Sequence, residues 1–331
     1  MKILVKAAHL FLASILIFAL LVSAATFLNF GGAPLVQRLL PLRNPGGPSH
    51  SLLRFREATA SGPVDVVFLG ASHTYRGFDP RIFAGMGLTS MNLGSSAQSP
   101  LNTLALLERY LGTLKPKFVL YEIYQTALAI DGMESFYDIL SNTPVDKPMV
   151  EMAWNLRYPQ AWTALLSTSL RNFRIPMSSY VQRGKEGRDD TYIEGGYVQT
   201  RATFPEVRLA RLQSASAQME FPFDHRQFDF FSKCIEMVRG HGAVFACCSY
   251  PIPAETRKAL AGYEDKQRAI SLFLKKCAVP FKDFNENMTL DTAKNYYDEV
   301  HLNQAGVELF NQALIEWLRS EKILPQASSR H

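Results

Sequence analysis

The sequence predicts an α/β fold: a three-layer sandwich in which helices cover both faces of a central parallel sheet. Short runs of β-branched and aromatic residues alternate with segments whose apolar residues recur every three or four positions, as in strand–helix units. The run Val66–Leu69 is apolar throughout, which indicates a strand buried on both faces. Gly70, Ala71 and Ser72 follow at once and predict a tight turn into a helix at the carboxyl edge of the sheet.

The first half of the core shows this alternation up to about residue 130. Asp79 stands before Pro80, and an aspartate followed by proline is typical of the first turn of a helix. The expected elements are strands over Val64–Leu69, Thr89–Leu93 and Phe118–Ile123, and helices over Pro80–Gly85 and Pro100–Gly112.

The alternation resumes near residue 226 and continues almost to the end of the chain. The expected elements are helices over Phe228–Gly240, Asp265–Cys277 and Val307–Leu318, and strands over Ala243–Tyr250 and Val279–Phe284. One domain over residues 64–324 is therefore predicted, followed by a polar, frayed tail at 325–331.

A mainly helical insertion is predicted at about 131–225, where the strand–helix alternation stops. Met149–Phe173 has a helical pattern, Arg183–Asp190 is a charged loop, and the glycines within Thr191–Thr203 suggest a hairpin. An insertion of this length builds either a lid or binding wall, or a satellite helical pair in which Trp154 and Trp162 are merely packed.

The N-terminal residues 1–30 predict a membrane anchor. Lys2 and Lys6 precede the largely apolar run Ala7–Phe30, which is long enough to span a bilayer, since about 20 apolar residues suffice. The lysines predict a cytoplasmic N-terminus and an extracytoplasmic remainder. A signal peptide cleaved near Val22–Ala25 is the alternative. Residues 31–63, rich in glycine and proline, are expected to form a linker with at most one short helix, Leu52–Glu57.

Composition excludes several classes of function. The net charge of +5 comes without a basic stripe interleaved with aromatic residues, so nucleic-acid binding is not expected. The sequence contains neither a Cys/His spacing typical of a metal site nor a phosphate-binding glycine loop, so we expect no cofactor. Cys247 and Cys248 are adjacent in a predicted strand and therefore point to opposite faces, which favours packed free thiols for both.

Ser72, Asp298 and His301 are the candidate catalytic residues. A serine at the start of a helix, at the carboxyl edge of a parallel sheet, has the position of a nucleophile, although it could serve only as a helix cap. Asp298 and His301 are three residues apart just before the last predicted helix. At that spacing the carboxylate can accept from one imidazole nitrogen and leave the other to face a serine, unless the segment is only a solvated acidic loop.

These motifs resemble those of the SGNH (GDSL-type) hydrolase superfamily, whose fold is flavodoxin-like. Gly70-Ala71-Ser72-His73 is similar to its nucleophile block, Asn92-Leu93-Gly94 to its second block, and Asp298-x-x-His301 to its last block. The resemblance covers residues 64–130 and 226–320. It implies a Ser–His–Asp triad and an oxyanion hole formed by the N–H groups of Ser72 and Gly94.

The block that normally supplies Gly-x-Asn-Asp is not recognisable, because the chain reads Tyr121-Glu122-Ile123-Tyr124-Gln125 after the third core strand. Gln125 or Tyr124 could replace its side-chain oxyanion donor. Residues around the motifs are candidates for substrate binding, namely His73, Tyr75, Asn92 and Tyr124.

The pattern is most similar to the divergent, membrane-anchored branch that acts in cell-envelope acyl transfer, such as alginate acetylation proteins and D-alanine transfer proteins. The resemblance implies an extracytoplasmic acyltransferase that acts through an acyl-enzyme on a surface polysaccharide, beside a multi-spanning membrane acyltransferase. The alternatives are a carbohydrate esterase that removes acyl groups and an inactive scaffold or binding protein with the same fold.

Overall fold

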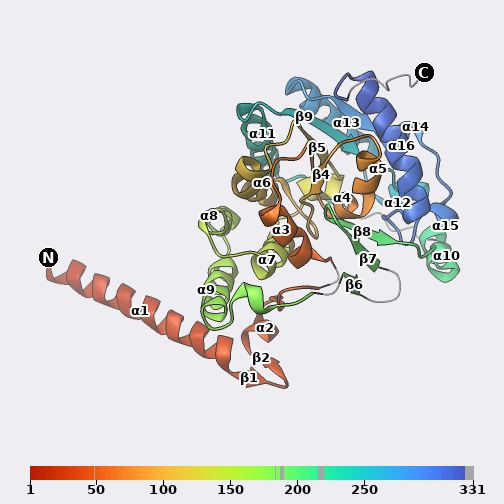
Figure 1. Cartoon of the computed structure of the whole chain (residues 1–331). Helices are drawn as coiled ribbons and strands as arrows, with labels where there is room; N and C mark the ends of the chain where they lie inside the picture. The colour runs from red at the N-terminus through yellow and green to blue at the C-terminus, as the bar shows by residue number, and fades with distance from the viewer. Residues whose placement is uncertain (48, 183, 187–189, 215–219, 325–331) are drawn as a thin grey trace.

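The computed structural model describes residues 1–47, 49–182, 184–186, 190–214 and 220–324. Its centre is a five-stranded parallel sheet with the order β10-β9-β5-β3-β4 (Figure 1). The predicted parallel α/β sandwich and its five core strands are confirmed. The strands are β3 (Val66–Leu69), β4 (Ser90–Asn92), β5 (Phe118–Glu122), β9 (Val244–Ser249) and β10 (Phe281–Asp283).

The central strand β3 divides the core into two apolar layers. Val67 and Leu69 belong to one buried cluster, whereas Val66 and Phe68 belong to the other, because successive side chains point to opposite faces. The adjacent thiols of β9 are divided in the same way, and all four cysteines are free. This burial on both faces explains why the strands are apolar without alternation.

Helices cover both faces of the sheet, as Figure 1 shows. Three helices pack their apolar residues into the first layer, namely α6 (Pro100–Leu114), α11 (His225–Gly240) and α13 (Tyr263–Lys276). Two helices pack into the second layer, namely α5 (Pro80–Ala84) and α16 (Gln304–Ser320). The helices expected from the sequence are therefore present, each within a few residues of its predicted ends.

In its described residues the insertion contains the helices α7 to α10, of which α10 spans Glu206–Ser214, and a small antiparallel sheet. The helices α7 (Met133–Asn142), α8 (Lys147–Leu156) and α9 (Pro159–Arg174) pack their apolar sides into the first core layer. The stretch predicted as one helix is broken between α8 and α9, where Arg157 adopts a φ of 62° before Pro159.

The small sheet of the insertion has the order β6-β7-β8, in which β6 is Lys185–Glu186, and it contains the predicted hairpin. The strands β7 (Asp190–Ile193) and β8 (Tyr197–Thr200) pair through the turn at Gly195 and Gly196, and β8 packs against the helix that follows Ser72. Half of the predicted charged loop Arg183–Asp190 lies outside the described residues, and in the other half Lys185 and Glu186 form β6 and Asp190 begins β7, so this part is not a loop.

The linker prediction for residues 31–63 is wrong for its last part. Helix α3 (Ser51–Ala60) is longer than the short helix expected there, and its Leu52, Phe55 and Ala58 are buried. Its Arg54 is fully buried as well. Residues of the predicted linker therefore take part in the domain core, because the apolar side of α3 packs against α6 and α7 and because Val36 and Leu42 belong to the same buried cluster.

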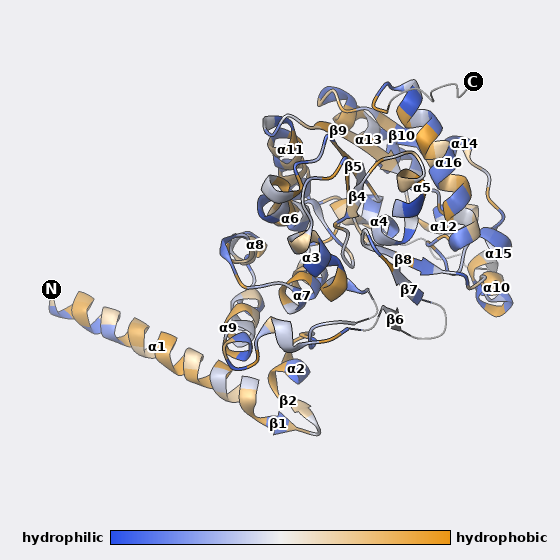
Figure 2. Ribbon diagram, in the orientation of Figure 1, coloured by the Kyte–Doolittle hydropathy of each residue, from blue (hydrophilic) through white to orange (hydrophobic). Residues whose placement is uncertain are grey.

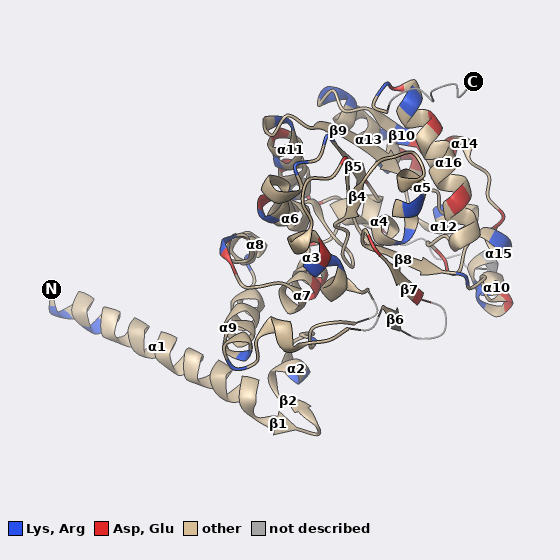
Figure 3. Cartoon of the chain, in the orientation of Figure 1, with Lys and Arg blue, Asp and Glu red and all other residues tan. Residues whose placement is uncertain are grey.

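Helix α1 (Lys2–Phe27) is, within the described residues, the single helix long and apolar enough to cross a membrane. Figure 1 shows it as a rod that leaves the domain, Figure 2 shows that it is largely apolar, and Figure 3 shows its basic residues only near the N-terminal end. Its last part packs against α9, where the Thr26 hydroxyl donates to Ser167 Oγ at 2.9 Å.

The remaining elements are short. They are β1 (Asn29–Phe30), β2 (Ala33–Pro34), α2 (Val36–Leu39), α4 (Ser72–Gly77), β6 (Lys185–Glu186), α10 (Glu206–Ser214), α12 (Ala254–Ala259), α14 (Phe284–Asn287), α15 (Thr292–Asn295) and the 3-10 helices Gln125–Leu128 and Met177–Ser179.

Candidate active site

A glycine turn places Ser72 at the carboxyl edge of the sheet, between β3 and α4. Gly70 has a φ of 133°, and a Cβ there would lie 2.5 Å from the carbonyl oxygen of Glu122 and 2.4 Å from Thr74 Oγ1. Only glycine fits this turn, because the backbone of β5 approaches it so closely. Ser72 then begins α4, where the first N–H groups have no partner within the helix.

The structure brings Ser72, His301 and Asp298 into one hydrogen-bonded line. His301 Nε2 lies 2.7 Å from Ser72 Oγ, and His301 Nδ1 lies 2.8 Å from Asp298 Oδ2. A carboxylate only accepts hydrogen bonds, so Nδ1 carries the proton and Nε2 is left to accept from the serine hydroxyl. This is the arrangement that a general base and its nucleophile require.

The carboxylate of Asp298 is fixed by its own loop. Its Oδ1 accepts from the backbone N–H groups of Val300 at 2.9 Å and His301 at 2.7 Å. Burial by itself raises the pKa of Asp298, but the hydrogen bonds from His301 and from these two N–H groups outweigh burial and lower the pKa to about 2.

Burial acts on the pKa of the His301 imidazole in the opposite direction from its effect on the carboxylate. It disfavours the imidazolium and lowers the pKa of His301 below its ordinary value, although Asp298 raises it in part. His301 is therefore neutral near pH 7 and can accept the hydroxyl proton of Ser72.

An aromatic wall that the sequence analysis missed encloses the outer side of His301. The ring of Tyr297 stacks on the imidazole with centroids 5.6 Å apart, and the guanidinium of Arg76 lies 5.2 Å from the centre of the Tyr297 ring. Arg76 is held in place by two hydrogen bonds to Asp190 of β7, at 2.9 and 3.1 Å. A sequence signal did exist, since Arg76 follows Ser72 by one helical turn and Tyr297 precedes Asp298.

His73 lies beside the triad but does not contact Ser72 through a hydrogen bond. Its ring stacks on Tyr250 and meets the edge of Tyr124, and its centroid is 5.2 Å from that of His301. His73 Nδ1 faces Glu122 Oε1 at 3.3 Å, and both side chains are buried. Glu122 thus occupies the end of β5, where the Gly-x-Asn-Asp block was expected.

The residues expected to complete the oxyanion hole are engaged elsewhere. The N–H of Gly94 donates to Asn92 Oδ1 at 2.9 Å, and Asn92 Nδ2 donates to the carbonyl of Thr74 at 2.8 Å. The amide of Gln125 donates to α13, at Tyr263 O and Gln267 Oε1. Asn92 and Gln125 are therefore structural in this conformation, and Gly94 lies beside the nucleophile turn with its N–H occupied.

Buried Arg54 of α3 explains the position of Gly94. It donates to the carbonyls of Gly94 and Gly196 at 2.9 Å each, and to that of Ser49 at 2.7 Å. Its guanidinium also lies 4.3 Å from the centre of the Tyr75 ring, one of the predicted substrate-binding side chains. One cation thus holds together α3, the Asn92–Gly94 loop and the β7–β8 hairpin.

A polar cavity of about 610 Å³ opens next to Tyr75 and Arg76. Most of the residues that line it carry a hydroxyl, carboxylate, amide or guanidinium group. The carboxylate of Asp138 accepts hydrogen bonds from the hydroxyl of Ser51 at 2.8 Å and from the backbone N–H of Ser96 at 3.2 Å. The cavity is lined by Pro41, Arg43, Gly46, Ser49, Tyr75, Arg76, Ser96, Met133, Glu134, Tyr137, Asp138, Ser141 and Asn142.

The fold is similar to that of GDSL-like lipases and acylhydrolases. One is a GDSL-like lipase from Bacteroides thetaiotaomicron, with a TM-score of 0.43 and 16% identity over 83% of this chain and 99% of that one. Another is the lipase/acylhydrolase from Enterococcus faecalis, with a TM-score of 0.40 and 11% identity over 78% of this chain and 96% of that one. Neither a family model nor a curated protein sequence matches the chain.

Proposed function

We propose that this protein is a membrane-anchored, extracytoplasmic serine acyltransferase of the SGNH type that acts on a cell-surface polysaccharide. The observation that carries the proposal is the line Asp298–His301–Ser72, with a neutral imidazole between an ionised carboxylate and a hydroxyl. Helix α1 has the length and composition for the anchor. We also expect a multi-spanning membrane acyltransferase as the partner that supplies acyl groups.

The geometry supports a two-step transfer through an ester on Ser72. Ser72 Oγ attacks the carbonyl carbon of the donor while His301 Nε2 takes the hydroxyl proton, and Asp298 stabilises the imidazolium. The tetrahedral intermediate collapses when His301 returns the proton to the leaving oxygen. An acceptor hydroxyl then gives its proton to His301 and attacks the carbonyl carbon of the acyl-enzyme. The bond to Ser72 Oγ breaks as His301 returns this proton to it, and the acylated acceptor leaves.

We expect the N–H of Ser72 to be one donor to the oxyanion of that intermediate. The N–H of Gly94 becomes the second donor if it leaves Asn92 Oδ1 when substrate binds. A single such donor changes the rate by roughly 100- to 1000-fold, so the change of partner of the Gly94 N–H, from Asn92 to the oxyanion, is expected to contribute strongly to catalysis.

The polar cavity next to Arg76 favours a polyhydroxylated acceptor. Its volume of about 610 Å³ is that of a ligand site, since such sites measure about 300–1,000 Å³. Carboxylates such as Asp138 and Glu134 accept hydrogen bonds from sugar hydroxyls, and Arg43 and Arg76 donate to sugar oxygens. The guanidinium of Arg76 also lies over Tyr297, so the cavity adjoins the wall of the triad.

An inactive scaffold is the second candidate, favoured by one observation. The N–H of Gly94 and the amide of Gln125 are both bonded within the protein, so the second oxyanion donor is not in place in this conformation. A protein without catalysis would keep these bonds with any ligand.

Labelling of the full-length protein with a fluorophosphonate probe separates the enzyme from the scaffold. We expect labelling of the native protein and of Ser61→Ala, which removes an exposed serine hydroxyl, but none of Ser72→Ala. Absence of label on the native protein would show that Ser72 is not an activated nucleophile.

A transfer assay then separates the transferase from an esterase with the same triad. Purified protein is given p-nitrophenyl acetate with and without an oligosaccharide, and acetylated sugar is measured by mass spectrometry. We expect acetylated sugar, and less of it with Asp138→Asn or Glu134→Gln at unchanged fluorophosphonate labelling. Free acetate as the single product would instead indicate an esterase.

A further inference from the structure

The end of α1 and the corner between α8 and α9 form one continuous surface. Val22 and Thr26 of α1 are buried against the domain, while the helix up to Phe18 is exposed. Phe18 lines a groove of about 530 Å³ together with both exposed tryptophans of this corner. The groove is lined by Phe18, Trp154, Arg157, Tyr158, Pro159 and Trp162.

Helix α9 runs beside the last third of α1. Its first turn shares the groove with Phe18, its middle contacts Thr26 through Ser167, and the guanidinium of Arg174 at its end lies 5.4 Å from the centre of the Phe27 ring. Any membrane depth assigned to α1 therefore also applies to the start of α9.

The length of α1 gives that depth. A hydrocarbon core of about 30 Å takes about 20 helical residues, so a boundary at Lys2 on the cytoplasmic side puts the other boundary near Val22, the first residue of α1 that is buried against the domain. Lys6 then extends its long side chain back to the cytoplasmic headgroups. Phe18 stands four residues before Val22, which is about 6 Å inside the bilayer at 1.5 Å per residue, or somewhat less for a tilted helix. Side chains next to Phe18 thus reach the level of the acyl chains.

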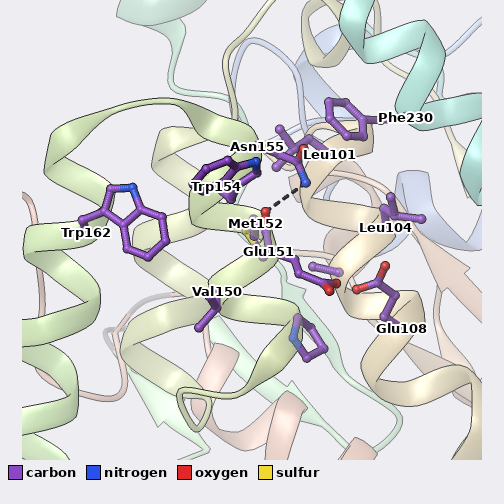
Figure 4. A pocket seen from close by; sticks show the side chains of 12 residues that line it. Leu101, Leu104, Glu108, Val150, Glu151, Met152, Trp154, Asn155, Trp162 and Phe230 are labelled. Atoms are coloured by element: carbon purple, nitrogen blue, oxygen red, sulfur yellow. Dashed lines mark hydrogen bonds between the residues drawn. The ribbon is translucent and has the colours of Figure 1, made fainter.

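The chemistry of the corner agrees with that depth. Trp154 is 72% exposed and Trp162 38%, and their rings meet edge to face with centroids 6.3 Å apart. Figure 4 shows both indoles beside a second, largely apolar cavity of about 260 Å³ that extends to Leu104 and Phe230. Tryptophan is enriched where a membrane meets water, and Arg157 beside the indoles is placed to bind a lipid phosphate.

We propose that the α8–α9 corner is inserted into the extracytoplasmic leaflet, with Trp154 and Trp162 among the lipid acyl chains near the headgroups. The occupant of the groove is phospholipid, because the groove is continuous with the lipid-facing side of α1. The domain is then held against the bilayer surface in a fixed orientation. This inference uses the proposed topology of α1 but not the proposed chemistry.

Brominated lipids test the insertion, since bromine quenches an indole that it touches. The full-length protein is reconstituted into phosphatidylcholine–phosphatidylglycerol vesicles with plain or brominated acyl chains. Trp317, the third tryptophan of the sequence, serves as the internal reference because it is buried in the core against Phe284. Trp317→Phe keeps the two corner indoles, and Trp154→Phe/Trp162→Phe keeps the reference alone.

We expect bromination to reduce the emission of Trp317→Phe severalfold and to leave that of Trp154→Phe/Trp162→Phe unchanged. Equal emission of Trp317→Phe in the two kinds of vesicle would overturn the proposal and point to a protein partner or to water at this face. Equal quenching of both variants would overturn it as well, because the effect would not belong to the corner. Loss of acyl transfer in the assay above leaves this result unaffected.

Discussion

Two histidine–carboxylate pairs lie side by side at the carboxyl edge of the sheet, and they differ in what the second ring nitrogen meets. His301 Nε2 faces Ser72 Oγ at 2.7 Å, while Nδ1 is held by Asp298. His73 faces Glu122 at 3.3 Å, and within the described residues its Nε2 has no hydrogen-bond partner. A histidine beside a carboxylate becomes a candidate base through the nucleophile at its other nitrogen, not through the carboxylate alone.

The two carboxylates also differ in how they are held. Asp298 and His301 belong to one short loop, and two backbone N–H groups fix the carboxylate. Glu122 ends β5, whereas His73 stands on α4, and Glu122 Oε2 has no hydrogen-bond partner in the described part of the chain. We therefore expect the first pair to act in proton transfer and the second to contribute to the packing beside the first.

Replacing each histidine in turn gives the largest expected difference. His301→Ala should lower the single-turnover acylation rate by about ten-thousand-fold or more, as for other triad members. His73→Ala is the matched control and should cost far less, since its ring has no contact with the Ser72 hydroxyl. The double variant Ser72→Ala/His301→Ala should be hardly worse than either single variant. Equal losses for the two histidines would remove the distinction between the pairs.

Replacing each carboxylate by its amide tests orientation of the base. Asp298→Asn should cost up to about ten-thousand-fold in kcat, because an amide can donate to Nδ1 and favour the wrong tautomer. Glu122→Gln keeps the volume of a side chain that touches neither Ser72 nor His301 through a hydrogen bond, so we expect a much smaller loss. A near-normal rate for Asp298→Asn would show that Asp298 is only a structural acid of the loop.

The turn at Gly70 leads into both Ser72, which faces His301, and His73, which faces Glu122, and a Cβ at Gly70 would overlap with Thr74 and with the backbone of Glu122. Gly70→Ala should destabilise the fold, because a strained backbone conformation costs about 1–3 kcal/mol even before the overlap with Glu122 is counted. Gly62→Ala is the control, since a Cβ there meets no atom within 4 Å. Thermal unfolding of both variants checks this; equal midpoints would mean that the turn adapts.

The sequence was sufficient for the sheet and for the expectation that Ser72, Asp298 and His301 lie together, because both depend on local signals. An apolar run ending in Gly-x-Ser and an Asp-x-x-His before a helix specify where each side chain enters the carboxyl edge. It was not sufficient for the surroundings. The bond from Gly94 to Asn92 depends on a side-chain conformation, and the burial of Arg54 depends on the carbonyls of Gly94 and Gly196 from distant segments, besides the nearby Ser49 carbonyl. The glycines and prolines of residues 31–63 predicted a linker with one short helix, and nothing in that pattern indicated that a basic residue of the helix is buried, because basic residues are ordinarily exposed.

The smallest expected effect is a shift in the pH dependence of the acylation rate. The direction of this shift differs between variants of the first and the second pair. The base works when the imidazole is neutral, so the acylation rate falls as the pH drops through the pKa of His301. Burial lowers that pKa, so the acid limb of the native enzyme should lie below pH 6.5, the ordinary value of a histidine. Asp298 raises the pKa of His301 and His73 lowers it through their charges. Asp298→Asn should therefore move the limb to lower pH, and His73→Gln should move it to higher pH.

Single-turnover acylation with p-nitrophenyl acetate between pH 4.5 and 8 would measure these limbs. Such a limb reports the ionisation of the free enzyme when substrate is below saturation. Opposite shifts would show that each pair acts on His301 through its charge, since a purely structural loss would lower the rate without moving the limb. Shifts in the same direction would mean that the two variants change the burial of His301 instead, and that the second pair has no electrostatic role at the site.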